Sequence, residues 1–239
     1  MLTTIDSFFS IVLVIVLYRW AKQHRLLVKP FLFHSANVVF LLGMTPWLDV
    51  MARDSIWLHS TQSVMVHHMA PLLWIMSLRH TAAPSSTHAP GWKITLFLTS
   101  FALLTWTWML PSIHPLLMQS AVIYSVMKWL MALTGLALCL TMLNRPSHSQ
   151  YWQRLNLVTV TLPLMFWGVM MLVIPDMYQS AHSSMHHHAM MSHVPEWLQL
   201  QPSQDQFLGG IIFILAGYVY WRKETSSEGL SGHARCVSE

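Results

Sequence analysis

The sequence predicts an all-α integral membrane protein, a bundle of about seven transmembrane helices with the N-terminus outside and the C-terminus in the cytoplasm. Composition is the first indication, because charged residues make up 9% of the 239 residues and hydrophobic residues 54%, whereas a typical soluble domain is about 25% charged. The second indication is the length of the apolar runs, and the third is the distribution of Lys and Arg between them.

The apolar runs have the length of membrane spans. A helix needs about 20 mainly apolar residues to cross about 30 Å of hydrocarbon. Runs close to this length lie at residues 2–20, 30–48, 56–78, 92–110, 121–143, 155–174 and 207–221. We therefore expect one membrane domain over residues 1–223, with an extracytoplasmic loop at 176–206, followed by a flexible cytoplasmic tail at 224–239.

The basic residues between the spans set the orientation, because cytoplasmic loops retain Lys and Arg. Eleven of the 13 basic residues fall in connections on one side of the predicted bundle, namely Arg19, Lys22, Arg25, Lys29, Arg79, Lys93, Arg145, Arg154, Arg222, Lys223 and Arg235. The opposite side has only Arg53. Lys128 lies inside the fifth span, and the alternative to a functional role for it is an anchor that snorkels to the interface. The net positive charge reflects this asymmetry, so the expected partner is a lipid bilayer and no nucleic acid.

The stretch from residue 182 to residue 193 is rich in metal-binding side chains. It contains five histidines and three methionines: His182, Met185, His186, His187, His188, Met190, Met191 and His193. Imidazole and thioether groups bind soft and borderline metals, copper above all, whereas Zn(II) prefers His, Cys and carboxylate ligands. Because the stretch has no acidic residue and no cysteine, it favours Cu(I). The alternative is a polar loop that is merely rich in histidine.

The third span is the most polar of the seven. At 100° per residue, one stripe of this helix carries His59, Gln62, Ser63, Val66 and Ala70. His67 lies at the edge of the stripe and His68 on the opposite side. An ionisable side chain at this depth is a functional candidate, so His59 and His67 are candidate metal ligands; the alternative for His67 and His68 is a hydrogen bond between helices. Pro71 leaves the carbonyl of His67 without its helical partner, so we expect a bend or an added polar contact there.

Two groups of motifs resemble the CtaG family of bacterial cytochrome c oxidase assembly proteins. Residues 45–49, 57–62 and 70–73 read TPWLD, WLHSTQ and APLL, and they are similar to the second and third helices of that family. Residues 202–210, PSQDQFLGG, resemble the entry into its last helix. The positions that match the family motifs are Asp49, Gln62, Asp205, Gln206, Gly209 and Gly210. The chain departs from the pattern at Ser63, which stands where the motif has a second histidine, while His67 lies one turn deeper.

The resemblance implies a multi-pass assembly factor in the bacterial inner (plasma) membrane that handles copper for a heme-copper oxidase. Its partners would be cytochrome c oxidase subunits or another copper chaperone, and Cu(I) is favoured over heme as the bound group. We expect Asp205 and Gln206 to matter to function beyond stability; the alternative is that Asp205 only caps the last helix. We expect no enzyme, because the chain contains neither a Ser/His/Asp or Cys/His arrangement nor a phosphate-binding loop.

Two other functions remain open from the sequence. A transmembrane metal transporter would need polar ligands at successive depths through the whole bilayer, whereas only His67 and Lys128 are deep. A heme-binding membrane protein would pair histidines on two facing helices. His34 and His67 would meet that requirement only if they lay at the same depth.

Overall fold

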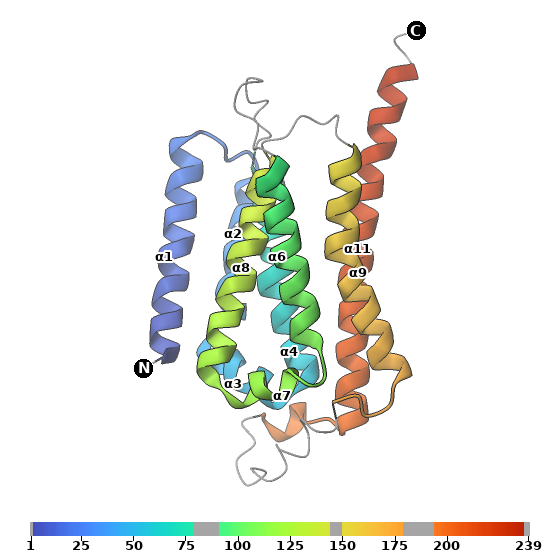
Figure 1. The fold of residues 1–239 in the computed structure, drawn as a ribbon. Helices are drawn as coiled ribbons and strands as arrows, with labels where there is room; N and C mark the ends of the chain where they lie inside the picture. Colours follow the sequence, from blue (N-terminus) through green and yellow to red (C-terminus); the bar gives the residue numbers. More distant parts are fainter. Residues whose placement is uncertain (1, 79–90, 144–149, 179–193, 237–239) are drawn as a thin grey trace.

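The computed structural model describes residues 2–78, 91–143, 150–178 and 194–236, and these residues fold into a helical bundle. The prediction of an all-helical protein is confirmed. The long helices run side by side, and the two termini lie at opposite ends of the bundle (Figure 1). An isolated antiparallel bridge between Leu27 and Leu78 joins the connection after the first helix to the end of α5.

The helices follow the predicted spans with some changes of boundary. The first half of the chain contains α1 (Leu2–Gln23), α2 (Pro30–Gly43), α3 (Pro46–Asp54), α4 (Ile56–Ser63), a π-helical segment η1 (Val64–Met69) and α5 (Ala70–Ser77). The second half contains α6 (Gly91–Met109), α7 (His114–Gln119), α8 (Ala121–Leu143), α9 (Gln150–Val173), a 3₁₀ turn η4 (Glu196–Leu198) and α11 (Pro202–Cys236). Helix α11 thus continues past residue 223, where the predicted tail begins.

The second predicted span is not one straight helix. Helix α2 ends at Gly43, and α3 begins at Pro46 after a bend of 58°. Proline fits the first turn of a helix, because a backbone N–H there would have no partner within the helix. Pro46 also holds the preceding Thr45 in an extended conformation. Because of the bend, α3 lies across the lower end of the bundle in Figure 1, and it directs Asp49 into the interior.

The third predicted span is helical throughout but changes its winding at the two histidines. In η1 the N–H of Ala70 bonds to the carbonyl of Met65, five residues earlier. A π-helical turn is a common way to accommodate a disturbed helical ladder, often at functional sites. Here it lies directly before Pro71, where the sequence predicts a bend or an added polar contact. The wider turn changes the directions in which His67 and His68 point.

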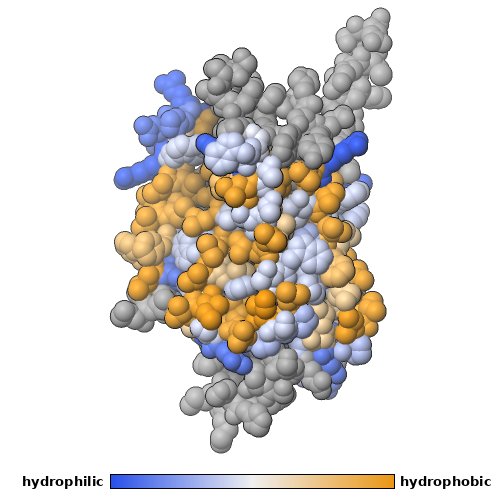
Figure 2. All heavy atoms as spheres, viewed as in Figure 1, coloured by the Kyte–Doolittle hydropathy of each residue, from blue (hydrophilic) through white to orange (hydrophobic). Residues whose placement is uncertain are grey.

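Hydropathy identifies few clear membrane spans among the described residues. One helix, α8 at Ala121–Leu138, is long and apolar enough to cross a membrane, and the bent pair of α2 and α3 passes the same test as a unit. The seven-span arrangement therefore stays a prediction. Large apolar side chains are nevertheless exposed on several helices, including Phe8, Phe31 and Leu103. In the view of Figure 2, hydrophobic residues are frequent in the middle of the molecule and hydrophilic ones gather toward its two ends.

Candidate functional site

A buried ion pair joins α3 to α8. The ammonium nitrogen of Lys128 lies 2.7 and 2.5 Å from the two carboxylate oxygens of Asp49, and it lies 3.6 Å from a carboxylate oxygen of Asp6 on α1. Lys128 is only 4% exposed, so the interpretation of this residue as an interfacial anchor is wrong. The physical reason is that two carboxylates compensate its charge, and a paired charge can remain in the interior.

Asp6 also fastens α1 to the bundle. Its carboxylate accepts hydrogen bonds from the hydroxyl of Ser125 at 2.7 Å and from the indole N–H of Trp129 at 3.1 Å. Both donors lie on α8, on either side of Lys128 in the sequence. These polar contacts hold the N-terminal part of α1 against α8. Without them the carboxylate of Asp6 would be buried with fewer partners.

Gln62 connects the ion pair to α4. Its amide nitrogen donates to the carboxylate of Asp49 and, at 2.6 Å, to the carbonyl of Gly43. Both partners are acceptors, which fixes the NH₂ group toward them and turns the amide oxygen toward α8. There the oxygen accepts a hydrogen bond from the hydroxyl of Tyr124. All donors and acceptors in this part of the network agree with one another.

The network determines which nitrogen of His59 carries the proton. Because the hydroxyl of Tyr124 donates to Gln62, its oxygen must accept at 3.1 Å from Nδ1–H of His59. A neutral imidazole that is protonated at Nδ1 has a lone pair on Nε2. That Nε2 atom is buried and has no hydrogen-bond partner among the described residues. A second polar group that fixes the tautomer and ring orientation is typical of metal-binding histidines.

His59 and His67 line one small cavity. The other residues around it are Gln62, Ser63, Trp108, Tyr124 and Lys128, and it has room for about one water molecule or ion. The hydroxyl of Ser63 lies 3.2 Å from Nδ1 of His67, and the side chain of His67 is buried. Ser63, at the position of the motif's missing histidine, thus contacts the histidine one turn deeper.

Sequence reasoning missed His114. Its side chain is 1% exposed, and its ring centroid lies 5.1 Å from that of His59 and 4.6 Å from that of Tyr178. The residue belongs to the short helix α7, between two prolines, where no helical period indicates which side is buried. Tyr178 donates to the carbonyl of Met109 at the end of α6, at 2.8 Å; burial raises the pKa of Tyr178, so its hydroxyl stays protonated and able to donate.

Asp205 caps α4 rather than its own helix. Its carboxylate accepts hydrogen bonds from the hydroxyl of Ser55 at 2.8 Å and from the backbone N–H groups of Ile56 at 2.8 Å and Trp57 at 2.9 Å. These are groups at the first turn of α4, where a helix has unpaired donors and the positive end of its dipole. The predicted alternative, a cap on the last helix, thus has the right chemistry but the wrong helix.

The rest of this motif holds α11 against two neighbours. Gln206 donates to the carbonyls of Met171 and Ile174 at the end of α9, at 2.8 and 2.7 Å. A Cβ atom at Gly209 would lie 2.9 Å from the hydroxyl oxygen of Ser60, and one at Gly210 would lie 2.8 Å from the carbonyl oxygen of Gly168. The motif at 205–210 therefore fixes α4, which carries His59, and α9 to the start of α11.

The remaining candidate ligands are not brought into this site. All eight His and Met candidates between 182 and 193 lie outside the described residues. Within the described ranges, no group of three or more His, Cys, Asp or Glu side chains is placed to hold a metal ion. His34 is exposed on α2 and its ring packs against Tyr18, whereas His67 is buried.

These features define a class: an all-helical protein whose interior holds a charged hydrogen-bond network that ends in an unpaired imidazole nitrogen. The chain belongs to the family of cytochrome c oxidase caa3 assembly factors, whose model matches residues 11–221. The predicted resemblance is thereby confirmed, and an assembly role implies association with cytochrome c oxidase. The matched range includes every residue of the network except Asp6. Searches of curated proteins and of solved structures found no match.

Proposed function

We propose that this assembly factor handles copper for its oxidase, and that His59 is the residue that receives the ion inside the bundle. The observation that carries the proposal is the lone pair on Nε2 of His59, which the contact with Tyr124 at 3.1 Å leaves unprotonated. A neutral imidazole nitrogen is the form that binds a metal. A buried nitrogen without a partner is also costly unless a ligand or water pairs with it.

The surroundings of His59 favour a monovalent soft cation. Cu(I) is stable with two to four imidazole or thioether ligands, and the imidazole of His67 lines the same cavity. The charged residue that lines the cavity is Lys128, and the carboxylates of Asp49 and Asp6 lie beside its ammonium group and compensate its charge. The compensated ammonium repels a monovalent cation less than an isolated one would.

In this proposal the stretch from 182 to 193 captures Cu(I) and passes it to His59. Several interchangeable His and Met ligands allow stepwise exchange of the ion, whereas a rigid cage would retain it. The stretch lies between the end of α9 and the start of α11, and Asp205 and Gln206 tie both of those helix ends to one region. The handover would therefore take place next to the capped end of α4.

Oxidase assembly in cells tests the function. His59→Asn should lower the copper content and activity of the client oxidase at an unchanged level of the assembly factor, and added copper in the medium should restore part of the loss. Replacing Met185, Met190 and Met191 together by Leu should weaken Cu(I) binding with little effect on Zn(II). Normal, fully copper-loaded oxidase in the His59→Asn strain would contradict the proposal.

We further propose that the protein spans the bacterial inner membrane several times, with residues 176–206 outside and Glu239 in the cytoplasm. The asymmetry of Lys and Arg supports this orientation. A cysteine introduced at Ser183 should react with an impermeant thiol reagent in intact spheroplasts. Reaction only after lysis would reverse the orientation and remove the argument for extracytoplasmic copper.

A further inference from the structure

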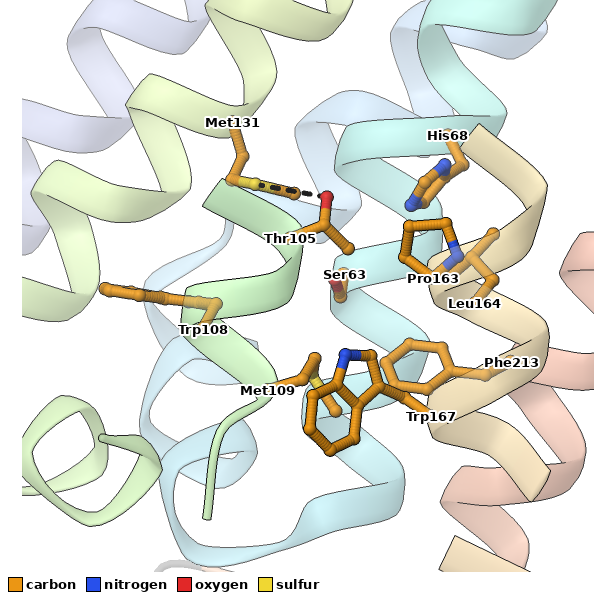
Figure 3. Close-up of a pocket in the computed structure, with 10 residues that line it drawn as sticks. All are labelled: Ser63, His68, Thr105, Trp108, Met109, Met131, Pro163, Leu164, Trp167 and Phe213. Carbon is orange, nitrogen blue, oxygen red and sulfur yellow. Dashed lines mark hydrogen bonds between the residues drawn. The ribbon is translucent and has the colours of Figure 1, made fainter. Parts of the chain in front are cut away.

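A second cavity lies between η1, α6, α8 and α9, and Ser63 lines both this cavity and the one at His59. Figure 3 shows the residues that line it, which are almost all apolar apart from His68, Thr105 and Ser63. The two cavities share only Ser63 and Trp108 as lining residues. The second cavity is therefore separate from the site of the proposed function, and its chemistry is different.

His68 points an unpaired imidazole into this cavity. Its side chain is 2% exposed, and its Nδ1 atom has no hydrogen-bond partner in the described part of the chain. Edge-to-face contacts with Phe101 and Tyr220, at centroid distances of 5.6 and 6.2 Å, hold the ring in place. Figure 3 shows the ring directed toward Thr105 and the interior of the cavity. The ring is thus fixed by packing, while its Nδ1 atom has no hydrogen bond among the described residues.

Two methionines supply sulfur around the same space. Met109 lies one helical turn after Thr105 on α6, so both face the cavity. Met131 enters from α8, and its sulfur lies 3.9 Å from the hydroxyl of Thr105. That hydroxyl already donates to the carbonyl of Phe101 at 2.8 Å, so it does not hold the sulfur firmly. Methionine has three rotatable bonds, which lets both thioethers turn toward a common centre.

The lining combines soft donors with a few polar groups. The polar groups are the imidazole of His68, two hydroxyl groups that are both in other hydrogen bonds, and the indole N–H of Trp167, which is buried without a partner among the described residues. Trp167 adds an aromatic ring beside Met109 (Figure 3), and aromatic faces attract monovalent cations in dry surroundings. The set of neutral soft donors excludes hard ions such as Mg²⁺, which require oxygen ligands.

We infer that this cavity binds one Cu(I) ion through the imidazole of His68 and the thioether sulfurs of Met109 and Met131. Imidazole and thioether ligands together select Cu(I) over Zn(II) and over hard cations. The site needs no residue of the 182–193 stretch and none of the ion network at Lys128. It goes beyond the proposed function, because it would retain Cu(I) inside the protein whether or not His59 receives it.

The test is an anaerobic titration of the purified full-length protein with Cu(I) against a chromophoric Cu(I) chelator. All variants carry Asn and Leu in place of the His and Met residues of 182–193, so that only interior sites remain. His68→Phe keeps an aromatic ring against Phe101 and Tyr220 while removing the ligand. The double variant Met109→Leu/Met131→Leu conserves side-chain volume. Met127→Leu, a buried methionine one turn earlier on α8 and outside this lining, is the matched control.

We expect His68→Phe to bind one Cu(I) fewer than its parent, and the double Leu variant to bind that ion about tenfold or more weakly, while Met127→Leu is unchanged. X-ray absorption at the copper edge should show sulfur neighbours that disappear in the double variant. Unchanged affinity and unchanged sulfur scattering in the double variant would overturn the inference, even if His68→Phe failed to fold. If His59→Asn binds one copper ion fewer and His68→Phe does not, this second site is refuted and the proposed function is not. If His68→Phe binds one copper ion fewer and His59→Asn does not, the proposed function is refuted and this second site is not.

Discussion

Asp205 and Asp49 are both motif carboxylates and both are buried, yet they do different things. Asp205 binds a hydroxyl and two backbone N–H groups at the start of α4. Asp49 binds side chains, the ammonium of Lys128 and the amide of Gln62, and through Gln62 and Tyr124 it is connected to His59. Asp205 thus fixes the backbone at the start of α4, whereas Asp49 belongs to a network that ends at the candidate ligand His59.

The largest effect on stability is expected from Lys128→Met. Removing the ammonium leaves Asp6 and Asp49 buried near each other, and breaking a buried ion pair from one side costs about 3–5 kcal/mol. The measurement is the thermal unfolding midpoint in detergent. The triple variant Lys128→Met/Asp49→Asn/Asp6→Asn removes the charges together and should recover most of the loss. A Lys128→Met protein that is as stable as wild type would show that the ion pair contributes little to the stability of the fold.

A smaller loss is expected at the other carboxylate. Asp205→Ala leaves the donors at the start of α4 without their acceptor, which should cost about 2–3 kcal/mol, whereas Asp205→Asn keeps one acceptor oxygen and should cost about 1 kcal/mol. Thermal unfolding measures both. The capping contacts of Asp205 lead us to expect, contrary to the expectation from the sequence, that oxidase assembly per folded molecule is unchanged in Asp205→Asn. Failed assembly at a normal level of stable Asp205→Asn protein would instead give this carboxylate a role beyond its cap.

A loss of stability of about 1–3 kcal/mol is expected from Tyr124→Phe, because it leaves the amide oxygen of Gln62 and Nδ1–H of His59 buried without partners. It should also weaken metal binding, since the group that orients a ligating histidine is worth about 10–100-fold in affinity. Cu(I) competition titration measures this effect. Tyr178→Phe is the matched control, because its hydroxyl bonds to the carbonyl of Met109 and not to His59. Equal affinities in both variants would disconnect Tyr124 from the candidate ligand.

Local patterns predicted most of the helices and several residues of the site. Apolar runs located the helices, and the polar stripe on the third span singled out His59 and Gln62, which the structure places in one network. Distant pairings were not predictable in this way. Asp49 lies 79 positions from Lys128, and Asp205 lies 149 positions from the N–H that it caps. A sequence shows that a buried charge needs a partner, but only the packing of helices decides which partner it has.

The histidines of η1 show a second reason why the sequence could not predict the whole site. An ideal helical wheel puts His67 at the edge of the polar stripe and His68 opposite, and the structure does place them in different cavities. The wheel could not show that the helix widens to a π turn there, nor that the side opposite the stripe faces methionines and tryptophan rather than apolar packing alone. Methionines look like ordinary core residues in sequence, so the second cavity gave no signal.

Nitrogen NMR of protein labelled with ¹⁵N-histidine can determine whether Nε2 of His59 is unprotonated and binds Cu(I). The His59 signals are identified by their loss in His59→Asn. Before metal is added, we predict a proton on Nδ1 and none on Nε2, and anaerobic addition of Cu(I) should shift the Nε2 resonance while Nδ1 keeps its proton. A proton on Nε2, or an Nε2 resonance that Cu(I) leaves unchanged, would contradict the account.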